Sequence, residues 1–467
     1  MTSLAPLFRD LIVIGAGPAG GNAALAAVRA GLDVLIVDEG VQPGGQVWRA
    51  PAPGMTPAPD ADFERGASLR QRLQQAAIPI RSETGVWSVA PIEGGFEVAL
   101  AGPEGPELIQ TRRLLVATGA QERVVPFAGW TLPGVFGLAA ATVLLKSSNF
   151  LPGRRILVAG QGPLLIAVAA KALKLGKAPV AVVDYNSRLD WLRSLPGFVR
   201  HLPSFRQGLI WQAQLARAGV RVRRQSEILR AEPDATGILG AVTIGPVGGG
   251  APQRVEVDTL LVGNGLVPGD EILRLLGARQ RPDPFGGWQV EADETGRSSV
   301  PGLYVAGDCG RIRGALPAAD QGERTGTAIA QDAGRAVSAP PRRNPALERF
   351  ADASCALMRV EDRRIAALPD DVILCRCEDV TVGAVRAAIA DGAQDANQLK
   401  HFTRLGMGPC QGRMCGANAA ALLRLSPGTR PGGERLTPRS PLRPVEIPQM
   451  AGSFDYADIP VPKPAPL

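Results

Sequence analysis

The sequence predicts an α/β fold with two parallel-sheet units and a small cysteine-bearing unit toward the C-terminus. Residues 11–38 and again residues 154–185 read as a buried apolar strand, a glycine turn, a helix of small residues and a second strand. That strand–helix–strand order requires a parallel sheet. The third observation is that four of the six cysteines lie within residues 375–415.

The composition describes a globular protein with an ample core. The chain has 467 residues, of which 45% are hydrophobic and 20% charged; such values are typical of globular chains, and the length suits several units. Fifty-one Lys and Arg against 44 Asp and Glu give a net charge of +7. This charge suits anionic cofactors or an acidic partner, but a basic, arginine-rich proteome is the interpretation we favour. No basic patch is interleaved with aromatic residues, so we expect no nucleic-acid binding.

The sequence also indicates a compartment. No apolar run reaches the roughly 20 residues of a membrane helix, and the apolar stretch at residues 11–15 continues into the glycine turn rather than forming part of a signal peptide. Clustered thiols without a signal peptide indicate metal ligation under reducing conditions. We expect no membrane span and a cytoplasmic location, with peripheral attachment to the inner membrane through partners left open.

The first glycine turn has the spacing of a dinucleotide-binding loop. Gly15 permits the tight turn, Gly17 lets the backbone approach a pyrophosphate, and Gly20 lets helix and strand pack closely. The N-terminus of the following helix would stabilise the anion. Asp38, at the end of the second strand, is placed to accept hydrogen bonds from a ribose, with Glu39 as the nearest alternative.

The second glycine turn departs from that pattern. Gly160 and Gly162 are present, but Leu165 fills the third position, where a side chain prevents close packing of helix and strand. Asp184 ends the next strand and keeps nucleotide binding open. We therefore expect the fold of this unit but leave its ligand undecided.

Three further loops strengthen the first site. Gly45 and Gln46 belong to a flexible PGGQ loop, residues 117–119 end a strand with small residues, and Gly307 and Asp308 lie at another strand end. Asp308 could hydrogen-bond a ribityl chain. Each loop alone is as readily explained as a tight turn, but their order and spacing together favour a flavin site.

The order GAGPAG, GGQ, ATGA and VAGD, with a nucleotide-type unit before the last, resembles that of the flavoproteins with two dinucleotide-binding domains. The resemblance implies two Rossmann-like domains in a disulfide-reductase-like fold, with FAD along the first. The residues implied as its contacts are Gly15, Gly17, Ala19, Gly20, Asp38, Glu39, Gly45, Gln46, Ala117, Thr118, Gly119, Gly307 and Asp308. Gly160 and Gly162 would serve a nucleotide in the second domain.

The cysteine spacing predicts a metal centre. Cys375 and Cys377 form C-x-C, and Cys410 and Cys415 form C-x4-C; four thiolates complete either a [2Fe–2S] cluster or a structural zinc site. C-x-C is too short for a zinc knuckle, and alternation along an extended segment would point both sulfurs the same way. Zinc stays the alternative on spacing alone.

A closer resemblance covers roughly residues 8–425. The segments GWTLPGV, GQGPLLIAVA, GNGLVPGDEILRLLG and K-x2-T-R-x-G-M-G-x-C-Q-G-R-x-C resemble those of the large subunit of multi-subunit amine dehydrogenases, of the opine oxidase, hydroxyproline dehydrogenase and hydrogen cyanide synthase types. The resemblance implies a [2Fe–2S] cluster in a bacterioferritin-associated-ferredoxin-like domain at Cys375, Cys377, Cys410 and Cys415. Related assemblies differ in whether FAD, NAD or ATP occupies the large subunit.

The chain lacks a recognisable substrate-converting site. No C-x2-C or C-x4-C lies outside the cluster segment, as a disulfide reductase would need, and no carboxylate pair or Cys–His arrangement marks a pocket. We expect no catalytic residue here, only electron relay. An amino-acid-oxidase-like flavoprotein partner would oxidise a secondary amine such as octopine, nopaline or hydroxyproline. FMN at a subunit interface, a small third subunit, and the acceptor or quinone stay open.

Three alternatives remain at this stage: a self-contained NAD(P)H:acceptor reductase that uses the Gly160 unit, a subunit that forms cyanide from glycine, and a scaffold whose cluster is structural or senses redox state. The expected division is a flavin domain at 1–150 and 266–337, an inserted nucleotide-binding domain at 151–265, a linker at 338–371, the cluster domain at 372–425 and a Pro-rich tail at 426–467. The tail is expected to be disordered or to lie extended on another surface, such as that of a partner protein.

Overall fold

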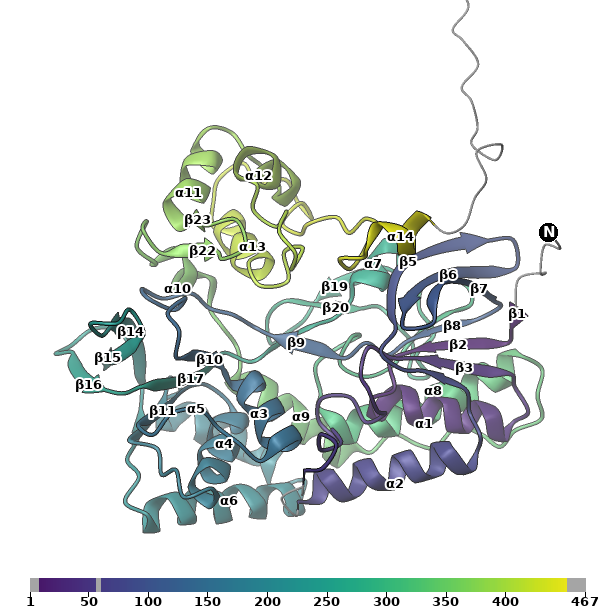
Figure 1. Ribbon diagram of the computed structural model, residues 1–467, viewed down its shortest axis with the longest axis horizontal. Helices are drawn as coiled ribbons and strands as arrows, with labels where there is room; N and C mark the ends of the chain where they lie inside the picture. Colours follow the sequence, from purple (N-terminus) through teal and green to yellow (C-terminus); the bar gives the residue numbers. More distant parts are fainter. Residues whose placement is uncertain (1–7, 56–59, 452–467) are drawn as a thin grey trace, which may run out of the picture.

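The computed structural model describes residues 8–55 and 60–451. Two α/β halves lie side by side, and a small unit of short helices lies above them in Figure 1. That small unit contains α11 (Val382–Ala390), α12 (Ala396–Thr403) and α13 (Gly416–Arg424). The expected fold class, α/β with two Rossmann-like units and a small cysteine unit, is confirmed.

The first half is built on a five-stranded parallel sheet in the order β21-β8-β2-β3-β4. Its strands are β2 (Leu11–Ile14), β3 (Val34–Val37), β4 (Ile80–Arg81), β8 (Leu114–Val116) and β21 (Leu303–Val305). The longest are entirely buried runs of apolar residues because both faces of the sheet are covered. Ile14 lies opposite both Val37 and Val116, so the strands reach their carboxyl edge together.

Helices cover one face of this sheet and a second sheet covers the other. The helices are α1 (Pro18–Arg29), α2 (Ala61–Gln75) and α8 (Ala315–Asp332). The second sheet, in the order β1-β7-β6-β5, consists of β1 (Phe8–Arg9), β5 (Gly85–Ile92), β6 (Gly95–Gly102) and β7 (Gly105–Thr111). Within this second sheet, β5 pairs with β6 and β6 with β7, both antiparallel.

The second half repeats the plan with the sheet order β10-β17-β11-β12-β13, all parallel. Its strands are β10 (Val135–Gly137), β11 (Ile156–Gly160), β12 (Ala181–Asp184), β13 (Val222–Arg224) and β17 (Thr259–Gly263). The helices of this half are α3 (Leu138–Ser148), α4 (Pro163–Lys174), α5 (Arg188–Phe198) and α6 (Leu202–Arg217). A three-stranded sheet of β14 (Ser226–Pro233), β15 (Leu239–Pro246) and β16 (Gln253–Glu256) lies against the other face.

The structure differs from the expected division at residue 150. β10 and α3 belong to the second half, because β10 pairs with β17. The halves are joined instead by an antiparallel pair, β9 (Ala120–Glu122) and β18 (Leu266–Pro268). After the crossing come α7 (Glu271–Leu275) and the hairpin of β19 (Gln280–Pro282) and β20 (Trp288–Val290). Strand pairing over long sequence distances decides this boundary, and local patterning does not reveal it.

Residues 338–371, expected as a linker, contain two helices, α9 (Pro345–Leu357) and α10 (Asp362–Ala366). Asn344 caps α9 by accepting from the backbone N–H groups of Ala346 and Leu347 at 3.1 and 3.3 Å, and Pro345 occupies its first turn. The small unit that follows begins with the pair β22 (Ile373–Cys375) and β23 (Val380–Thr381). Its core is continuous with that of the second half.

The described part of the tail, residues 426–451, lies on this chain itself. Leu442 is buried against the first half, with its N–H donating to the Trp87 carbonyl at 2.7 Å. The short helix α14 (Ile447–Ala451) follows beside β7. Residues 452–467, the rest of the expected tail, lie outside the described residues.

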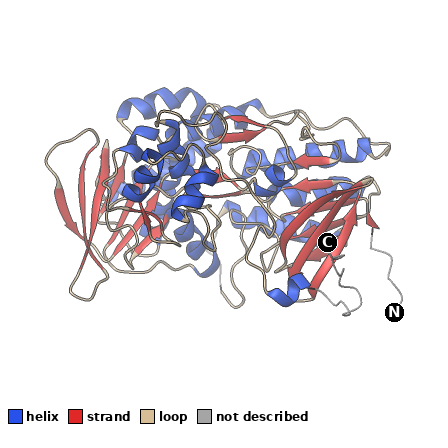
Figure 2. Cartoon of the chain, turned by 90° about the horizontal axis from the view of Figure 1, so that it is seen from above, coloured by secondary structure: helices blue, strands red, loops and turns tan. Residues whose placement is uncertain are grey.

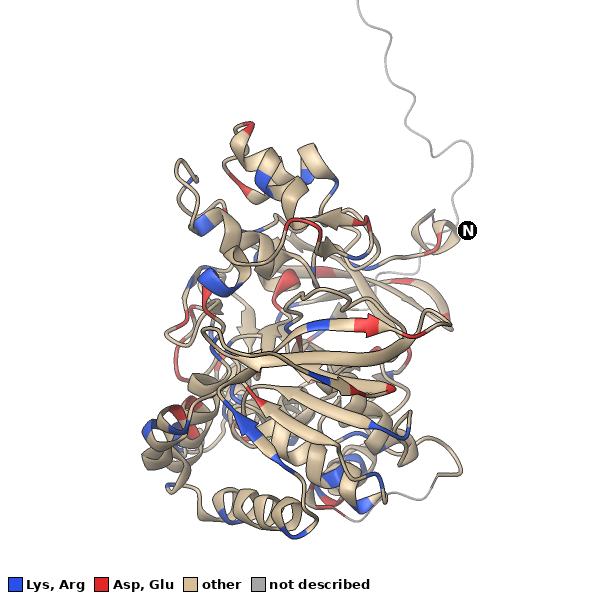
Figure 3. Cartoon of the chain, turned by 90° about the vertical axis from the view of Figure 1, so that its left-hand side faces the viewer, with Lys and Arg blue, Asp and Glu red and all other residues tan. Residues whose placement is uncertain are grey.

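Viewed from above, strands lie toward both ends of the molecule and most helices lie between them, as Figure 2 shows. Basic and acidic positions are interspersed on the side seen in Figure 3, without a large region of one sign. In the described part of the chain, every helix is too short or too polar to cross a bilayer.

Candidate functional site

The first glycine turn connects β2 to α1 at the carboxyl edge of the parallel sheet. Gly15 has a φ of +105°, and a Cβ there would lie 2.4 Å from the Ala117 carbonyl oxygen. A Cβ on Gly20 would lie 1.9 Å from the Gly15 oxygen. Beside Gly17, in contrast, the nearest atom to an added Cβ is the Cα of Gly45, at 3.9 Å. Gly15 and Gly20 thus allow the backbone to pack closely, whereas Gly17 leaves a concave backbone surface open to a ligand.

Asp38 is held rigidly beneath this turn. Its Oδ2 accepts from the Ala16 N–H at 2.5 Å and its Oδ1 from the Gly40 N–H at 2.7 Å. Burial raises the pKa of Asp38 above its ordinary value, opposed by these two hydrogen bonds. Each oxygen keeps a further lone pair for a ribose hydroxyl. Glu39, the alternative, instead pairs with Arg443 of the tail at 2.8 Å.

The PGGQ loop folds over the glycine turn, as its composition allowed. The Gly44 N–H donates to the Ala16 carbonyl at 2.9 Å, and Gly45 lies directly against Gly17. Gln46 is exposed, and its side-chain oxygen accepts from Arg49 at 2.9 Å. The loop therefore forms one wall of the candidate site.

The ATGA and VAGD loops reach the same edge from β8 and β21. The Thr118 hydroxyl donates to the Gly269 carbonyl at 2.6 Å, and the Gly269 N–H donates to the Gly119 carbonyl at 3.0 Å. Asp308 accepts through Oδ1 from the N–H groups of Arg313 and Gly314, at 2.7 and 2.9 Å. Burial raises the pKa of Asp308 despite these bonds, and its second oxygen remains able to accept from a ligand.

Close helix packing sets where this edge lies. A Cβ added to Gly322 would lie 2.1 Å from the carbonyl oxygen of Ala19, and a Cβ added to Gly326 would lie 2.2 Å from the carbonyl oxygen of Ala23. α1 and α8 therefore touch backbone to backbone, and both begin near the carboxyl edge of the sheet. Gly307 lies there as well, donating its N–H to Gln321 at 3.1 Å. The residues predicted for the first site are thus brought together.

The second glycine turn is covered by the chain's own residues. A Cβ on Gly162 would lie 2.6 Å from Cγ of Met358, and one on Gly265 would lie 2.9 Å from Cβ of the same methionine. The side-chain amide of Gln161 donates to the Arg359 carbonyl at 3.0 Å. The segment that follows α9 thus occupies the surface beside Gly160 and Gly162 where a pyrophosphate would approach.

Asp184, the carboxylate of the second unit, is also engaged. It is fully buried and accepts from the Trp191 indole at 2.7 Å and from the Asn186 N–H at 3.0 Å. The Arg364 guanidinium lies over the ring of the neighbouring Tyr185, 4.3 Å from its centroid. These contacts stabilise a closed second unit and leave little access for a ribose.

The four clustered cysteines approach one another in two pairs. Cys375, at the end of β22, contacts Cys415 just before α13, and Cys377 contacts Cys410. The hydrogen bond with Cys415 lowers the pKa of the Cys375 thiol to about 6, opposed by burial and assisted by the N–H groups of Gly406, Glu378 and Cys377. The same bond, together with burial, raises the pKa of Cys415.

This geometry differs from the expected one in a single respect. The two sulfurs of C-x-C do not alternate along one strand, because the chain turns after Cys375 and Asp379 adopts a φ of +50°. Within residues 8–55 and 60–451, no three His, Cys, Asp or Glu side chains converge on one point. The four thiols nevertheless lie close together, and four thiolates suit either a [2Fe–2S] cluster or a zinc site.

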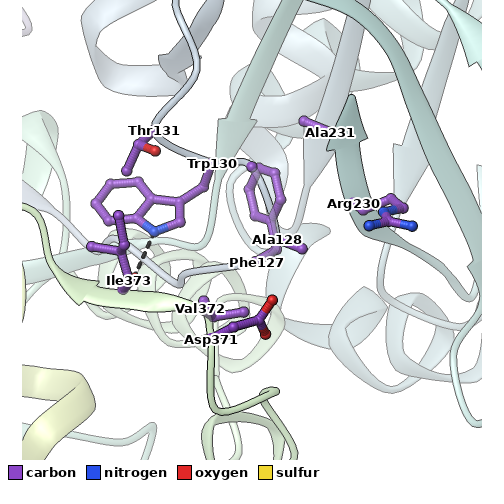
Figure 4. Close-up of a pocket in the computed structure, with 10 residues that line it drawn as sticks. Phe127, Ala128, Trp130, Thr131, Arg230, Ala231, Asp371, Val372 and Ile373 are labelled. Carbon is purple, nitrogen blue, oxygen red and sulfur yellow. Dashed lines mark hydrogen bonds between the residues drawn. The ribbon is translucent and has the colours of Figure 1, made fainter. Parts of the chain in front are cut away.

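A cavity of about 230 Å³ lies away from these groups, between the second half and the start of the small unit. Figure 4 shows Trp130 beside it, with its indole N–H directed at Ile373. That hydrogen bond to the Ile373 carbonyl is 2.7 Å long. None of the predicted site residues lines this cavity, and Trp130 instead anchors the small unit to the second half.

Comparison with known proteins identifies both parts. Residues 9–331 match the family described as pyridine nucleotide-disulphide oxidoreductase, and residues 373–424 match the BFD-like [2Fe-2S] binding domain. An opine oxidase subunit of Rhizobium meliloti (strain 1021) is 34% identical, over 95% of this chain and 98% of its own length. The chain belongs to the family of these opine oxidase subunits. The resemblance seen in the sequence is thereby confirmed.

A further relative and a solved structure are also similar to this chain. Hydrogen cyanide synthase subunit HcnB of Pseudomonas aeruginosa (strain PAO1) is 31% identical over 93% of this chain and 96% of its own length. L-proline dehydrogenase from P. horikoshii has the same fold, with a TM-score of 0.70 and 22% identity over 97% of this chain and 81% of that one. As a member of the opine oxidase subunit family, the present chain is part of an oxidoreductase. Its two matched domains imply FAD and a [2Fe–2S] cluster.

The residues present fit both groups. The open backbone at Gly17, the two α-helix starts and the free acceptor capacity of Asp38 and Asp308 suit a dinucleotide such as FAD. The paired thiols, with backbone N–H groups directed at Cys375, suit a [2Fe–2S] cluster, since such donors tune its potential.

Three residues with notable surroundings in the structure were not singled out from the sequence. Glu122 caps the start of α3, accepting from the Ala139 N–H at 2.9 Å, and burial raises its pKa to about 7. Met358 covers the second glycine turn, and Arg123 is a buried arginine at the junction of the units. Glu122 and Arg123 follow closely after the ATGA segment. Two charged residues so near a buried strand were a weak sign of a functional role, because buried charged residues usually need a partner.

Proposed function

We propose that this chain is the electron-transferring flavin and [2Fe–2S] subunit of a hetero-oligomeric dehydrogenase acting on CH–NH donors. The observation that carries the proposal is a bonded connection between the two candidate sites. Thr118 of the ATGA loop bonds to Gly269, and two residues later Glu271 forms an ion pair with Arg413 at 2.9 Å. Arg413 lies between Cys410 and Cys415.

This connection fixes the cysteine loop relative to the flavin loop. Arg413 also donates to the carbonyls of Cys410 and Leu442, at 3.3 and 2.9 Å. Gln121, next to the ATGA loop, donates to Glu271 at 3.2 Å. A flavin accepts electrons in pairs and a [2Fe–2S] centre passes them singly, so a rigid arrangement of their two binding loops is what relay requires.

The residues of this chain bind and orient the two groups without converting a substrate. The Gly15–Gly20 turn, Asp38 and Asp308 would hold FAD, and Cys375, Cys377, Cys410 and Cys415 would hold the cluster. Cys377 is exposed, whereas Cys375 and Cys415 are buried. One side of the centre would therefore face solvent or an acceptor protein, and the other would face the interior.

The partner would be a flavoprotein of the amino-acid oxidase type. Relatives of this chain are subunits of opine oxidase and hydrogen cyanide synthase, which supports a partner that performs the oxidation. The substrate would be a secondary-amine amino acid such as octopine, nopaline or hydroxyproline. FMN between the two subunits and a small third subunit complete the proposed assembly, with a carrier or quinone as acceptor.

Co-purification and a dye-linked assay test this function. The chain would be co-expressed with a candidate partner of the amino-acid oxidase type and assayed with octopine, nopaline, hydroxyproline and glycine. We expect one secondary amine to reduce both the flavin, seen by its absorbance, and the cluster, seen by electron paramagnetic resonance, but only when the partner is present. Substrate turnover by the partner alone, with an unreduced cluster here, would contradict the relay.

The likeness to hydrogen cyanide synthase subunit HcnB favours, as a second candidate, the alternative already raised from the sequence, in which cyanide is formed from glycine. Cyanide release from glycine by the co-purified assembly, without turnover of any secondary amine, would favour it. The same assay therefore distinguishes the two substrates.

The geometry argues against a self-contained NAD(P)H reductase. Met358 lies against Gly162, and Asp184 is already hydrogen-bonded, so hydride delivery from the second unit has no open nucleotide site among the described residues. We expect NADH and NADPH to leave the flavin of the isolated chain oxidised in stopped-flow measurements. Bleaching within seconds would restore the reductase as the better function.

A further inference from the structure

A second cavity, of about 160 Å³, lies where the two halves and the cysteine unit meet. Its walls come from the β9–β18 link, from the β19–β20 hairpin and from residues 411–420 of the cysteine unit. β9 crosses the centre of Figure 1, between the halves and below α10 and α13. The glycine turn at Gly15 and the four cysteines themselves do not line it.

Arg123 lines this cavity without a partner. It is 8% exposed, and its Nε is buried with no hydrogen-bond partner in the described part of the chain. Burial lowers the pKa of Arg123 to about 10, with Asp362 opposing and Arg424 and Arg364 adding to the effect. Asp362 does not serve as its counter-ion, because both its oxygens bond to Arg424 at 2.7 Å.

Each of the other arginines of the cavity has a carboxylate partner. Arg274 and Arg435 pair with Asp270 at 3.0 and 2.8 Å, and Arg413 pairs with Glu271 at 2.9 Å. A buried guanidinium without an anion is strongly unfavourable, and such charges are retained when they are paired. Arg123 is therefore the one arginine of this wall, among the described residues, that lacks an anion.

The charges of the lining indicate which anion fits. Five arginines and three carboxylates line the cavity, an excess of two positive charges. A phosphate monoester at neutral pH carries between one and two negative charges, and the planar guanidinium fork matches its oxygens. Phe285 and Trp288 form an aromatic part of the wall, which suits the organic group of such an ester. We propose that this cavity binds a small phosphate monoester through Arg123.

Ligand-dependent melting of the FAD- and cluster-loaded protein tests the site. Inorganic phosphate and AMP are the probes, and adenosine is the control that lacks a phosphate. We expect phosphate and AMP, but not adenosine, to raise the melting temperature. Arg123→Gln should weaken their binding by about tenfold or more, because a charge-assisted bond is lost, and Arg123→Lys should keep part of the affinity.

The unliganded Arg123→Gln protein gives a second readout. We expect it to melt no lower than the wild type, because the substitution removes an unpaired buried charge, whereas a structural arginine would lower the melting temperature when lost. Arg279→Gln, at an exposed arginine outside the cavity, is the matched control and should leave phosphate binding unchanged. Phosphate and AMP binding that is absent in the wild type, or undiminished in Arg123→Gln, would overturn the site.

Discussion

At the residue scale, Glu122 shows how burial sets the protonation of a single group. Burial raises the pKa of Glu122 from 4.5 to about 7, against the hydrogen bonds from the N–H groups of Ala139, Leu138 and Ala140. Between these two values the folded state binds more protons than the unfolded state, so stability falls as pH rises through this window. The helix start therefore holds a carboxyl group that is half neutral near pH 7.

Substituting this group should remove the pH dependence it causes. Glu122→Gln resembles the neutral acid, so at pH 8 we expect the variant to be more stable than the wild type, by up to about 3 kcal/mol. At pH 4.5 the two should differ little. Melting curves between pH 4.5 and 8 measure the difference, and a constant offset across that range would contradict the assignment.

Each of the four paired cysteines should be necessary for the iron centre. Substituting Cys375, Cys377, Cys410 or Cys415 by Ser should reduce bound iron and the cluster absorbance severely, because a thiolate ligand is lost, while FAD is retained. Cys355→Ser is the matched control, since that buried thiol donates to the Ile312 carbonyl. Iron and flavin analysis of purified protein checks this. Full iron content in a Cys415→Ser variant would rule that residue out as a ligand.

At the element scale, the contact of α1 with α8 determines the shape of the flavin site. Gly322→Ala places a methyl group 2.1 Å from the Ala19 carbonyl oxygen, so the helices must separate. We expect a loss of about 1–3 kcal/mol of stability and weaker retention of FAD, measured by thermal melting and by flavin content after desalting. Gly208→Ala in α6 is the control, because an added Cβ there meets no atom within 4 Å. It should stabilise slightly, by about 0.5–1 kcal/mol.

The elements differ in how far the sequence could predict them. The Gly15–Gly20 turn was predictable because its steric requirement is local. The cysteine spacing indicated four thiolate ligands but left zinc open, and the family resemblance favoured a [2Fe–2S] cluster. α9 was missed although Asn344 and Pro345 supply a helix start, since the Pro- and Arg-bearing context suggested a linker. The contact of Met358 with Gly162 joins residues 196 positions apart, and periodicity carries no information about such pairs.

At the scale of the whole molecule, the tail connects the cysteine unit to the flavin half. Arg435 pairs with Asp270 at 2.8 Å, and Gln411 and Arg413 donate to the carbonyls of Pro441 and Leu442. Leu442 is 3% exposed in the core of the flavin half. The cysteine unit shares its main core with the other half, so this tail adds a second link to the flavin half, beside the ion pair between Glu271 and Arg413.

Loosening that link should therefore slow electron transfer without unfolding either half. Leu442→Asp places a charge in the apolar contact, and we expect faster hydrogen exchange at residues 85–90 and 435–445, with the iron and FAD contents unchanged. Cluster reduction by substrate plus partner should become slower because the two binding loops are no longer held at a fixed separation. Ile447→Asp, at a side chain that is 80% exposed, should change neither quantity. Unchanged exchange in Leu442→Asp would show that the core shared with the second half and the Glu271–Arg413 ion pair position the cluster loop without the tail.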